Sequence, residues 1–111
     1  MSAEDYILSP DSAHKSDLIE GVFVMASPAS FDHASVQQFM LTTLSNFVSA
    51  RKAGVVLGEN AACRLSDDNV YQPDVSFLSN ERIGLAGAVY VNGAPDLTVE
   101  IISPSSRQYD A

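Results

Sequence analysis

The sequence predicts an α+β domain, a mixed sheet with flanking helices, on three observations. Residues 32–52 carry apolar side chains at helical spacing. Several short segments rich in β-branched residues follow this helix and are separated by turn residues. The 111 residues are 46% hydrophobic and 18% charged, which is enough for one modest core. We therefore expect a single domain over residues 1–111, in which residues 1–15 form an irregular or partly helical lead-in.

The first elements are a hairpin and the long helix. Residues 18–25 contain two short extended pieces that bend at Glu20-Gly21, and residues 26–30 form a turn. Asp32 or Ser30 can cap the amphipathic helix predicted over residues 32–52, and Gly54 can close it. The apolar residues of this helix recur every three or four positions: Val36, Phe39, Met40, Leu44, Phe47 and Val48.

The second half of the chain is predicted to consist of strands. Residues 55–57, 61–65 and 72–78 are short β-forming segments, and Asp67-Asp68-Asn69 is a turn between two of them. Residues 79–87 are predicted to be a loop or a short helix. Residues 96–102 form the most strongly β-forming run, which Ser103-Pro104 ends.

The composition excludes several classes of protein. Six Lys and Arg against fourteen Asp and Glu give a net charge of −8, which argues against binding to nucleic acid through a basic face. Carboxylates can nevertheless hold a divalent metal ion. The single cysteine, Cys63, excludes an internal disulfide and a Cys-based metal site, and we expect it to be a small buried residue. Because no apolar run can span a bilayer and the N-terminus lacks a secretory signal, we expect a cytoplasmic protein without a membrane partner.

Two acidic residues lie where apolar residues surround them. Asp74 follows Pro73 at a predicted strand, and Glu100 lies within the run 97–102. A buried carboxylate must be paired, hydrogen-bonded or bound to a metal ion, and two such groups on neighbouring strands could share one hard cation. The alternative is that Asp74 is a turn residue and Glu100 points into solvent. The residue types alone slightly favour this alternative.

Two other polar residues could join such a site. His33, at the start of the predicted helix, could act as a base, although a lone histidine is more often a capping or surface residue. Glu20 could reach the same site or simply occupy a turn. The sequence contains no glycine-rich phosphate-binding loop and no serine nucleophile elbow.

Three motifs occur in a characteristic order. The first runs over Asp17–Met25 and continues with Ser27-Pro28 and His33; the second is Gln72–Arg82; the third, the most specific, is Ala94–Ser106. Together they resemble the Uma-two family of restriction-endonuclease-like proteins. The resemblance extends from about residue 16 to the last residue.

The resemblance implies a restriction-endonuclease-like PD-(D/E)XK core and a Mg²⁺-dependent (or Mn²⁺-dependent) DNA endonuclease. Carried over to this sequence, Asp74 and Glu100 would be metal ligands, and the main-chain carbonyl of Ile101 would be a third. Glu20 and His33 match recurring family positions, so we include them with Asp74 and Glu100 as candidate catalytic residues. The metal would activate water for phosphodiester hydrolysis.

The sequence departs from the family pattern at informative places. Ile102 stands where the superfamily usually has a lysine, and Asp17 stands where a Glu is common. In the Uma-two family the lysine is expected a few residues beyond a residue that resembles Asp110, whereas this chain ends at Ala111. We therefore expect a C-terminally truncated core that carries half of a nuclease site and binds DNA in its full-length form.

A different class of function stays open. The net charge and the absence of the expected lysine favour a catalytically inactive nuclease-fold remnant that acts as an oligomerising or partner-binding module. In this reading, self-association into a homo-oligomer covers the exposed edge or apolar face of the strand 97–102. A third reading, an unrelated small α+β binding domain, would require all three motif matches to be chance.

Overall fold

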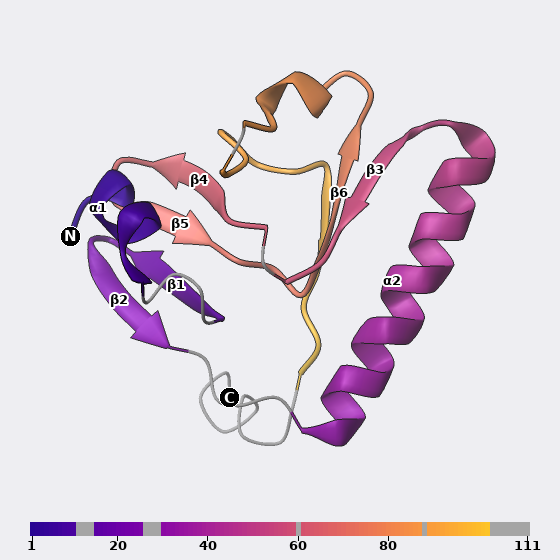
Figure 1. Cartoon of the computed structure of the whole chain (residues 1–111), viewed down its shortest axis with the longest axis horizontal. Coiled ribbons are helices and arrows are strands. Elements are labelled where there is room, and N and C mark those ends of the chain that lie inside the picture. Colours follow the sequence, from indigo (N-terminus) through magenta and orange to yellow (C-terminus); the bar gives the residue numbers. More distant parts are fainter. Residues whose placement is uncertain (11–14, 26–29, 60, 88, 103–111) are drawn as a thin grey trace.

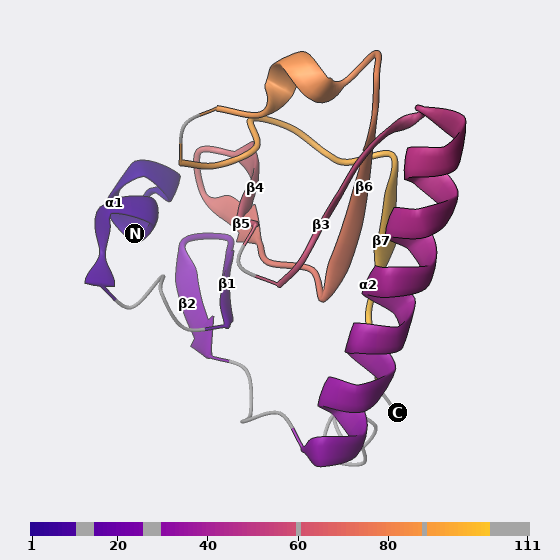
Figure 2. The same cartoon turned by 45° about the vertical axis from the view of Figure 1, so that its right-hand side comes forward.

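The chain folds into two antiparallel sheets and one long helix, as Figures 1 and 2 show. The computed structural model describes residues 1–10, 15–25, 30–59, 61–87 and 89–102. The α+β class is confirmed, but the strands divide between two antiparallel sheets instead of forming one mixed sheet. In chain order the elements are α1 (Ala3–Leu8), β1 (Ser16–Ile19), β2 (Val22–Met25), α2 (Phe31–Arg51), β3 (Gly54–Leu57), β4 (Cys63–Ser66), β5 (Asn69–Tyr71), β6 (Val75–Ser79), the 3-10 helix η2 (Ile83–Leu85) and β7 (Leu97–Val99).

The first sheet has the strand order β2-β1-β5-β4 and contains the predicted hairpin. Strands β1 and β2 pair in antiparallel register, with Leu18 opposite Phe23. Glu20 and Gly21 both have positive φ, +49° and +80°, as a tight turn between twisted strands requires. The Glu20 amide donates to Asn69 Oδ1 at 3.0 Å, which ties this turn to β5. The predicted bend is therefore confirmed.

Helix α1 covers the first sheet and supplies its central aromatic side chain. Tyr6 is fully buried, and its hydroxyl lies 2.6 Å from Ser16 Oγ and accepts a hydrogen bond from Gln72 Nε2 at 2.7 Å. Leu8, in contrast, is 75% exposed, because it lies on the opposite side of this short helix from the core. The buried core of this half comprises Ala3, Tyr6, Leu18, Ala62 and Val70.

Helix α2 has the predicted limits within one residue. Ser30 is the N-cap, and its hydroxyl accepts a hydrogen bond from the His33 amide at 3.1 Å. At the other end Lys52 takes the left-handed conformation, φ +52°, so that Lys52 and not Gly54 forms the C-cap. The helix lies on the face of the second sheet that points away from the first sheet, as Figure 2 shows.

Only part of the apolar surface predicted for α2 is buried. Val48 is buried, and Met40 and Leu44 are half-buried. Phe39 and Phe47 are 67% and 55% exposed. The prediction was therefore wrong about the width of the buried apolar stripe on this helix. The helix packs mainly on β3, and one strand covers only a narrow stripe of a helix surface.

The second sheet has the strand order β3-β6-β7 and positions the candidate site. Val75 of β6 lies opposite Val99 of β7. Strand β7 is shorter than the predicted run 96–102, so Glu100 follows the strand instead of lying deep within it. The apolar side chains between this sheet and β4 include Cys63, Leu78 and Val91, with Val55, Leu57 and Leu85 packed against them.

Some predictions fall on residues outside the described ranges. The predicted turn at residues 26–30 is described only at Ser30, and the segment from Ser103 onward is not described. Among the described helices none is long and apolar enough to cross a membrane.

Candidate functional site

Asp74 and Glu100 meet at one end of the second sheet. Asp74 directly precedes β6 and Glu100 directly follows β7, so the antiparallel register of the two strands places them opposite each other. Asp74 Oδ2 accepts a hydrogen bond from the Ile101 amide at 2.7 Å, and Glu100 Oε1 accepts one from the Asp74 amide at 3.3 Å. The Asp74 side chain is 2% exposed and that of Glu100 is 61% exposed. One buried and one accessible carboxylate therefore lie side by side.

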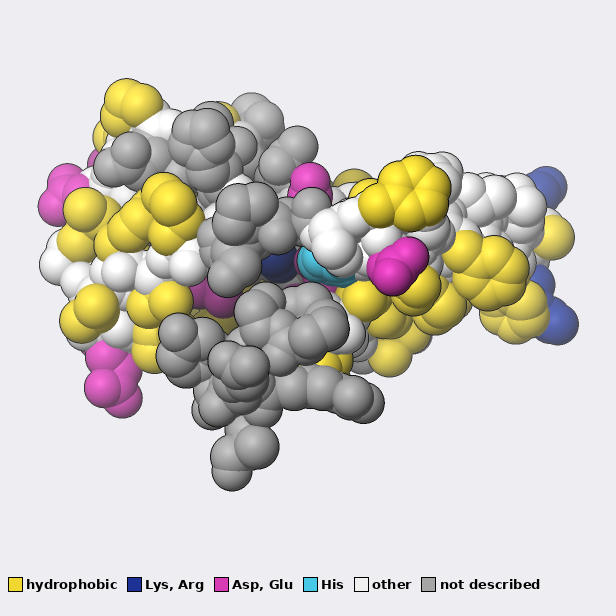
Figure 3. All heavy atoms as spheres, turned by 90° about the horizontal axis from the view of Figure 1, so that it is seen from below, with side chains coloured by type: hydrophobic (Ala, Val, Ile, Leu, Met, Phe, Trp, Pro, Cys, Tyr) yellow, Lys and Arg dark blue, Asp and Glu magenta, His cyan; other side chains and the backbone are white. Residues whose placement is uncertain are grey.

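Two basic side chains face this carboxylate pair. Lys15 Nζ lies 3.5 Å from Asp74 Oδ1 and 4.0 Å from Glu100 Oε2. His33 Nε2, from the first turn of α2, lies 3.3 Å from Asp74 Oδ2. Figure 3 shows a His side chain beside a Lys or Arg side chain near the middle of the view. Asp74 Oδ1 and His33 Nε2 are both buried, and neither makes a hydrogen bond within the described residues.

Helix α2 also fixes the backbone of the site. Gln37 Nε2 donates to the main-chain oxygen of Asp74 at 2.9 Å and lies 3.4 Å from Glu59 Oε2. Glu59, two residues after β3, is thereby linked to the Asp74 backbone through the Gln37 side chain. His33 and Gln37 are four residues apart and therefore lie on the same side of the helix, facing the site.

Asp17 adds another poorly solvated carboxylate. Its Oδ1 accepts a hydrogen bond from the Gln72 amide at 2.9 Å. Burial raises the pKa of Asp17, and the negative charge of Asp74 raises it further, whereas Lys15 opposes both effects. Loss of hydration also raises the pKa of Glu100, with the same opposition from Lys15. The acidic groups thus share a region in which negative charge is costly and a cation is favoured.

The structure does not bring Glu20 to this group. Glu20 lies in the turn after β1, whereas Lys15 lies just before β1, so five extended residue steps, roughly 16 Å, separate them. Its amide is bonded to Asn69, and the residue is exposed. His33, in contrast, lies within reach of Asp74, although the sequence alone favoured a capping or surface role for it.

The donor set suits a hard cation such as Mg²⁺ or Mn²⁺. The described residues contain no group of three or more His, Cys, Asp and Glu side chains that could hold a metal ion. They do contain two adjacent carboxylates, and one buried oxygen of Asp74 has no hydrogen bond. Oxygen ligands are those that these ions prefer, and main-chain carbonyls can complete such a site. Oxygen donors of the predicted kind are therefore present, and the metal ion and its third ligand, the carbonyl of Ile101, stay predictions.

Sequence reasoning missed several members of the group. Lys15 belongs to the predicted irregular lead-in, and Glu59 follows a strand with no motif around it. Gln37 lies within the predicted helix 32–52 and belongs to none of the three motifs. One signal was present for Asp17: it occupies a position where the family commonly has an acid.

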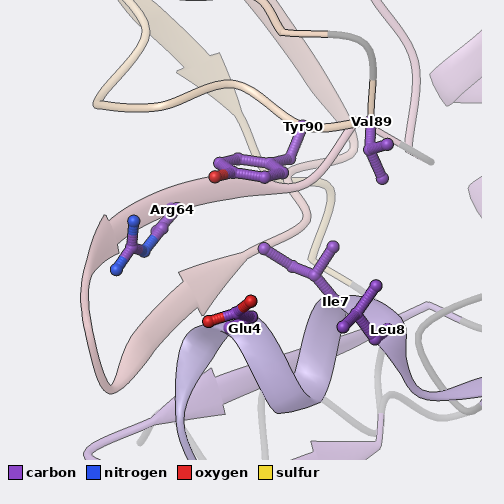
Figure 4. A pocket seen from close by; sticks show the side chains of 6 residues that line it. All are labelled: Glu4, Ile7, Leu8, Arg64, Val89 and Tyr90. Atoms are coloured by element: carbon purple, nitrogen blue, oxygen red, sulfur yellow. The ribbon is translucent and has the colours of Figure 1, made fainter.

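A separate pocket lies on the other half of the molecule, between α1 and β4 (Figure 4). Its volume is about 290 Å³, and it shares no lining residue with the carboxylate group. Arg64, on its wall, pairs with Asp67 of the β4–β5 turn. The lining residues are Glu4, Ile7, Leu8, Arg64, Val89 and Tyr90.

The comparisons with known proteins identify the family. The family model described as "Putative restriction endonuclease" matches residues 3–111. The chain belongs to the Uma2 (Uma-two) family. A solved structure, "a putative nuclease belonging to DUF820" from Anabaena variabilis ATCC 29413, has a TM-score of 0.79 at 22% identity over 99% of this chain. This similarity establishes the restriction-endonuclease-like fold.

The Uma2 chain spans 63% of the length of that nuclease structure. None of the curated proteins compared with the chain matches it. The family and the fold therefore rest on the family model and on the solved structure.

Proposed function

We propose that this Uma2 chain carries the divalent-metal site of a DNA endonuclease that hydrolyses phosphodiester bonds. One observation carries the proposal: the ends of β6 and β7 bring Asp74 and Glu100 together, and a buried oxygen of Asp74 has no hydrogen bond. Within the described residues this oxygen has only the ion pair with Lys15 at 3.5 Å, so it remains available as an oxygen ligand for a cation. Membership of a family described as a restriction endonuclease agrees with this chemistry.

Each side chain of the group has a role in this proposal. Asp74, Glu100 and the carbonyl of Ile101 would hold the Mg²⁺ or Mn²⁺, which lowers the pKa of bound water and stabilises charge in the transition state. His33 can hold a proton against Asp74 Oδ2 or accept one from water. Gln37 fixes the Asp74 backbone and so keeps the carboxylate aligned.

The charge of the chain makes the metal important for substrate binding as well. At a net charge of −8 the chain repels DNA, whose phosphates require cations. A bound divalent ion reverses the local charge at the site. We therefore expect DNA to bind weakly in the absence of a divalent metal.

A calorimetric Mn²⁺ titration of the parent chain beside the Asp74→Ala and Glu100→Ala variants tests the proposal. We expect saturable binding in the parent, and in both variants a loss of affinity greater than the roughly 10–100-fold that outer-shell substitutions cost. Glu81→Ala is a matched control, because Glu81 is exposed and lies beyond the opposite end of β6. Binding that survives both substitutions would contradict the proposed site. Saturable binding that both substitutions abolish would support it, and a longer form of the protein should then be tested for DNA cleavage.

A second function, that of an oligomerising module without cleavage, is favoured by a different observation. Among the described strands β7 lies at the edge of its sheet. Leu97 of this strand is 48% exposed, and Ile102, three residues beyond it, is 60% exposed. Phe39 and Phe47 on α2 add exposed aromatic surface. Unpaired strand edges and apolar patches favour association, and the partner we propose is a second copy of this chain.

A further inference from the structure

Lys15 occupies the position of a cation among the carboxylates of the site. Its side chain is 21% exposed, and its ammonium lies 3.5 Å from Asp74 Oδ1 and 4.0 Å from Glu100 Oε2. Among the described residues it is the one Lys or Arg side chain that forms an ion pair with either acid. The Asp74 oxygen that it faces is the same buried oxygen that has no hydrogen bond.

A buried carboxylate beside a second carboxylate needs positive charge nearby. In the metal-free chain Lys15 supplies that charge. A divalent ion that binds both carboxylates must lie within about 2–2.6 Å of their oxygens. The ammonium and such an ion would then compete for the same oxygen of Asp74, and their like charges would repel each other.

We infer that Lys15 is a built-in counter-ion that must leave Asp74 before a divalent cation binds. This inference rests on the proposed function, because it concerns the same carboxylates. Lys15 can move in this way because it lies before β1, outside the hydrogen-bonded strand, and because the ammonium of a lysine sits on a flexible four-carbon stem. The site thereby exchanges a tethered monovalent cation for a free divalent one.

The first test is the affinity for Mn²⁺ of Lys15→Met, measured by calorimetry. Methionine removes the charge and nearly keeps the length of the side chain, so we expect binding at least about tenfold tighter than in the parent, whereas Lys15→Arg should stay near the parent. Lys52→Met is the matched control, because it changes the net charge equally at the exposed C-terminal end of α2. Binding by Lys15→Met that is absent or no tighter than in the parent would overturn the inference.

The second test uses the unaltered protein, so its result does not depend on whether a variant folds. The chain has two lysines, Lys15 and Lys52, so the rate of reductive methylation of each can be followed by mass spectrometry with Lys52 as an internal reference. We expect Lys15 to react more slowly than Lys52 without metal, and at least about threefold faster at saturating Mn²⁺ than without it. A Lys15 rate that Mn²⁺ leaves unchanged would overturn the inference.

The failure of this inference differs from the failure of the proposed function. Equal Mn²⁺ binding by the parent and Lys15→Met, lost in Asp74→Ala, would leave the metal site in place and remove the role of Lys15. Tighter Mn²⁺ binding by Lys15→Met, together with no DNA cleavage by any form of the protein, would keep the role of Lys15 and contradict the endonuclease function.

Discussion

Asp17 is a charged residue whose ionised form the fold disfavours. Its carboxylate accepts a hydrogen bond from the main-chain amide of Gln72, yet burial raises its pKa above the ordinary value of 3.8. The folded chain therefore binds this proton more tightly than the unfolded chain does. The stabilising contribution of the protonated carboxyl is complete below pH 3.8 and is lost as the pH rises through the folded-state pKa.

We expect Asp17→Asn to be more stable than the parent at pH 7 and to lose most of this advantage at pH 4. Asparagine keeps the oxygen that accepts from Gln72 and removes the poorly solvated charge. Urea unfolding of both proteins at the two pH values measures the difference. An advantage that is larger at pH 4 than at pH 7 would contradict the direction of the pKa shift.

Residues embedded in regular patterns are the ones that a sequence can single out. Apolar neighbours drew attention to Asp74 and Glu100, and the family resemblance then made them candidate metal ligands. They lie 26 positions apart in the sequence, and the structure joins them by a hydrogen bond from the main-chain amide of Asp74 to Glu100. Lys15 could not be predicted in the same way. Its position at the site depends on how β1 pairs with β5, which is a tertiary property that local spacing does not determine.

At the scale of elements, the pairing of β3 with β6 depends on one glycine. Gly54 lies opposite Ser79, and a Cβ atom at Gly54 would lie 1.9 Å from the carbonyl oxygen of Leu78. No side chain fits at this distance, so the two backbones approach each other as closely as glycine alone allows.

We expect Gly54→Ala to destabilise the fold by about 3 kcal/mol or more, because the backbone of β3 must move away from β6. Gly84→Ala is the control, since a Cβ there meets nothing within 4 Å, and its stability should change by less than about 1 kcal/mol. Chemical denaturation of both variants measures the two free energies of unfolding. Equal stabilities would show that β3 can shift without cost.

The elements themselves were well predicted, whereas their burial was not. Helix α2 was predictable because a periodic pattern with a cap is a local signal. Which side of it is buried depends on the neighbouring sheet, and Phe39 and Phe47 belong to the apolar pattern without reaching that sheet. The division into two sheets likewise follows from long-range pairing.

At the scale of the whole molecule, one of the two buried clusters joins the sheets, and apolar residues at β7 and along α2 remain exposed. Cys63, Leu78 and Val91 join the sheets in one cluster. On the outside, several large apolar side chains are more than one third exposed. A chain with this surface has an energetic reason to associate, since burying one such side chain contributes about 1.5–3 kcal/mol.

We expect the parent chain to show a mass above that of the monomer in sedimentation equilibrium as its concentration rises. Phe39→Lys should weaken this association by about tenfold or more, because it removes one aromatic contact. Val89→Lys is the control, since Val89 is 70% exposed, close to the 67% of Phe39. This substitution adds the same charge, but away from α2 and β7. A monomer at all concentrations would count against the oligomerising module.

The crossed hydrogen bonds between Asp74 and Glu100 have a consequence for how the second sheet ends. Each carboxylate bonds to a main-chain amide on the opposite segment, so the two acids form the last rungs of the ladder between β6 and β7. The other two oxygens, Asp74 Oδ1 and Glu100 Oε2, are those that face the Lys15 ammonium. A cation bound there would draw electron density from the oxygens that accept the amide bonds, so the amide protons of Asp74 and Ile101 would report occupancy of the site while the sheet keeps its end.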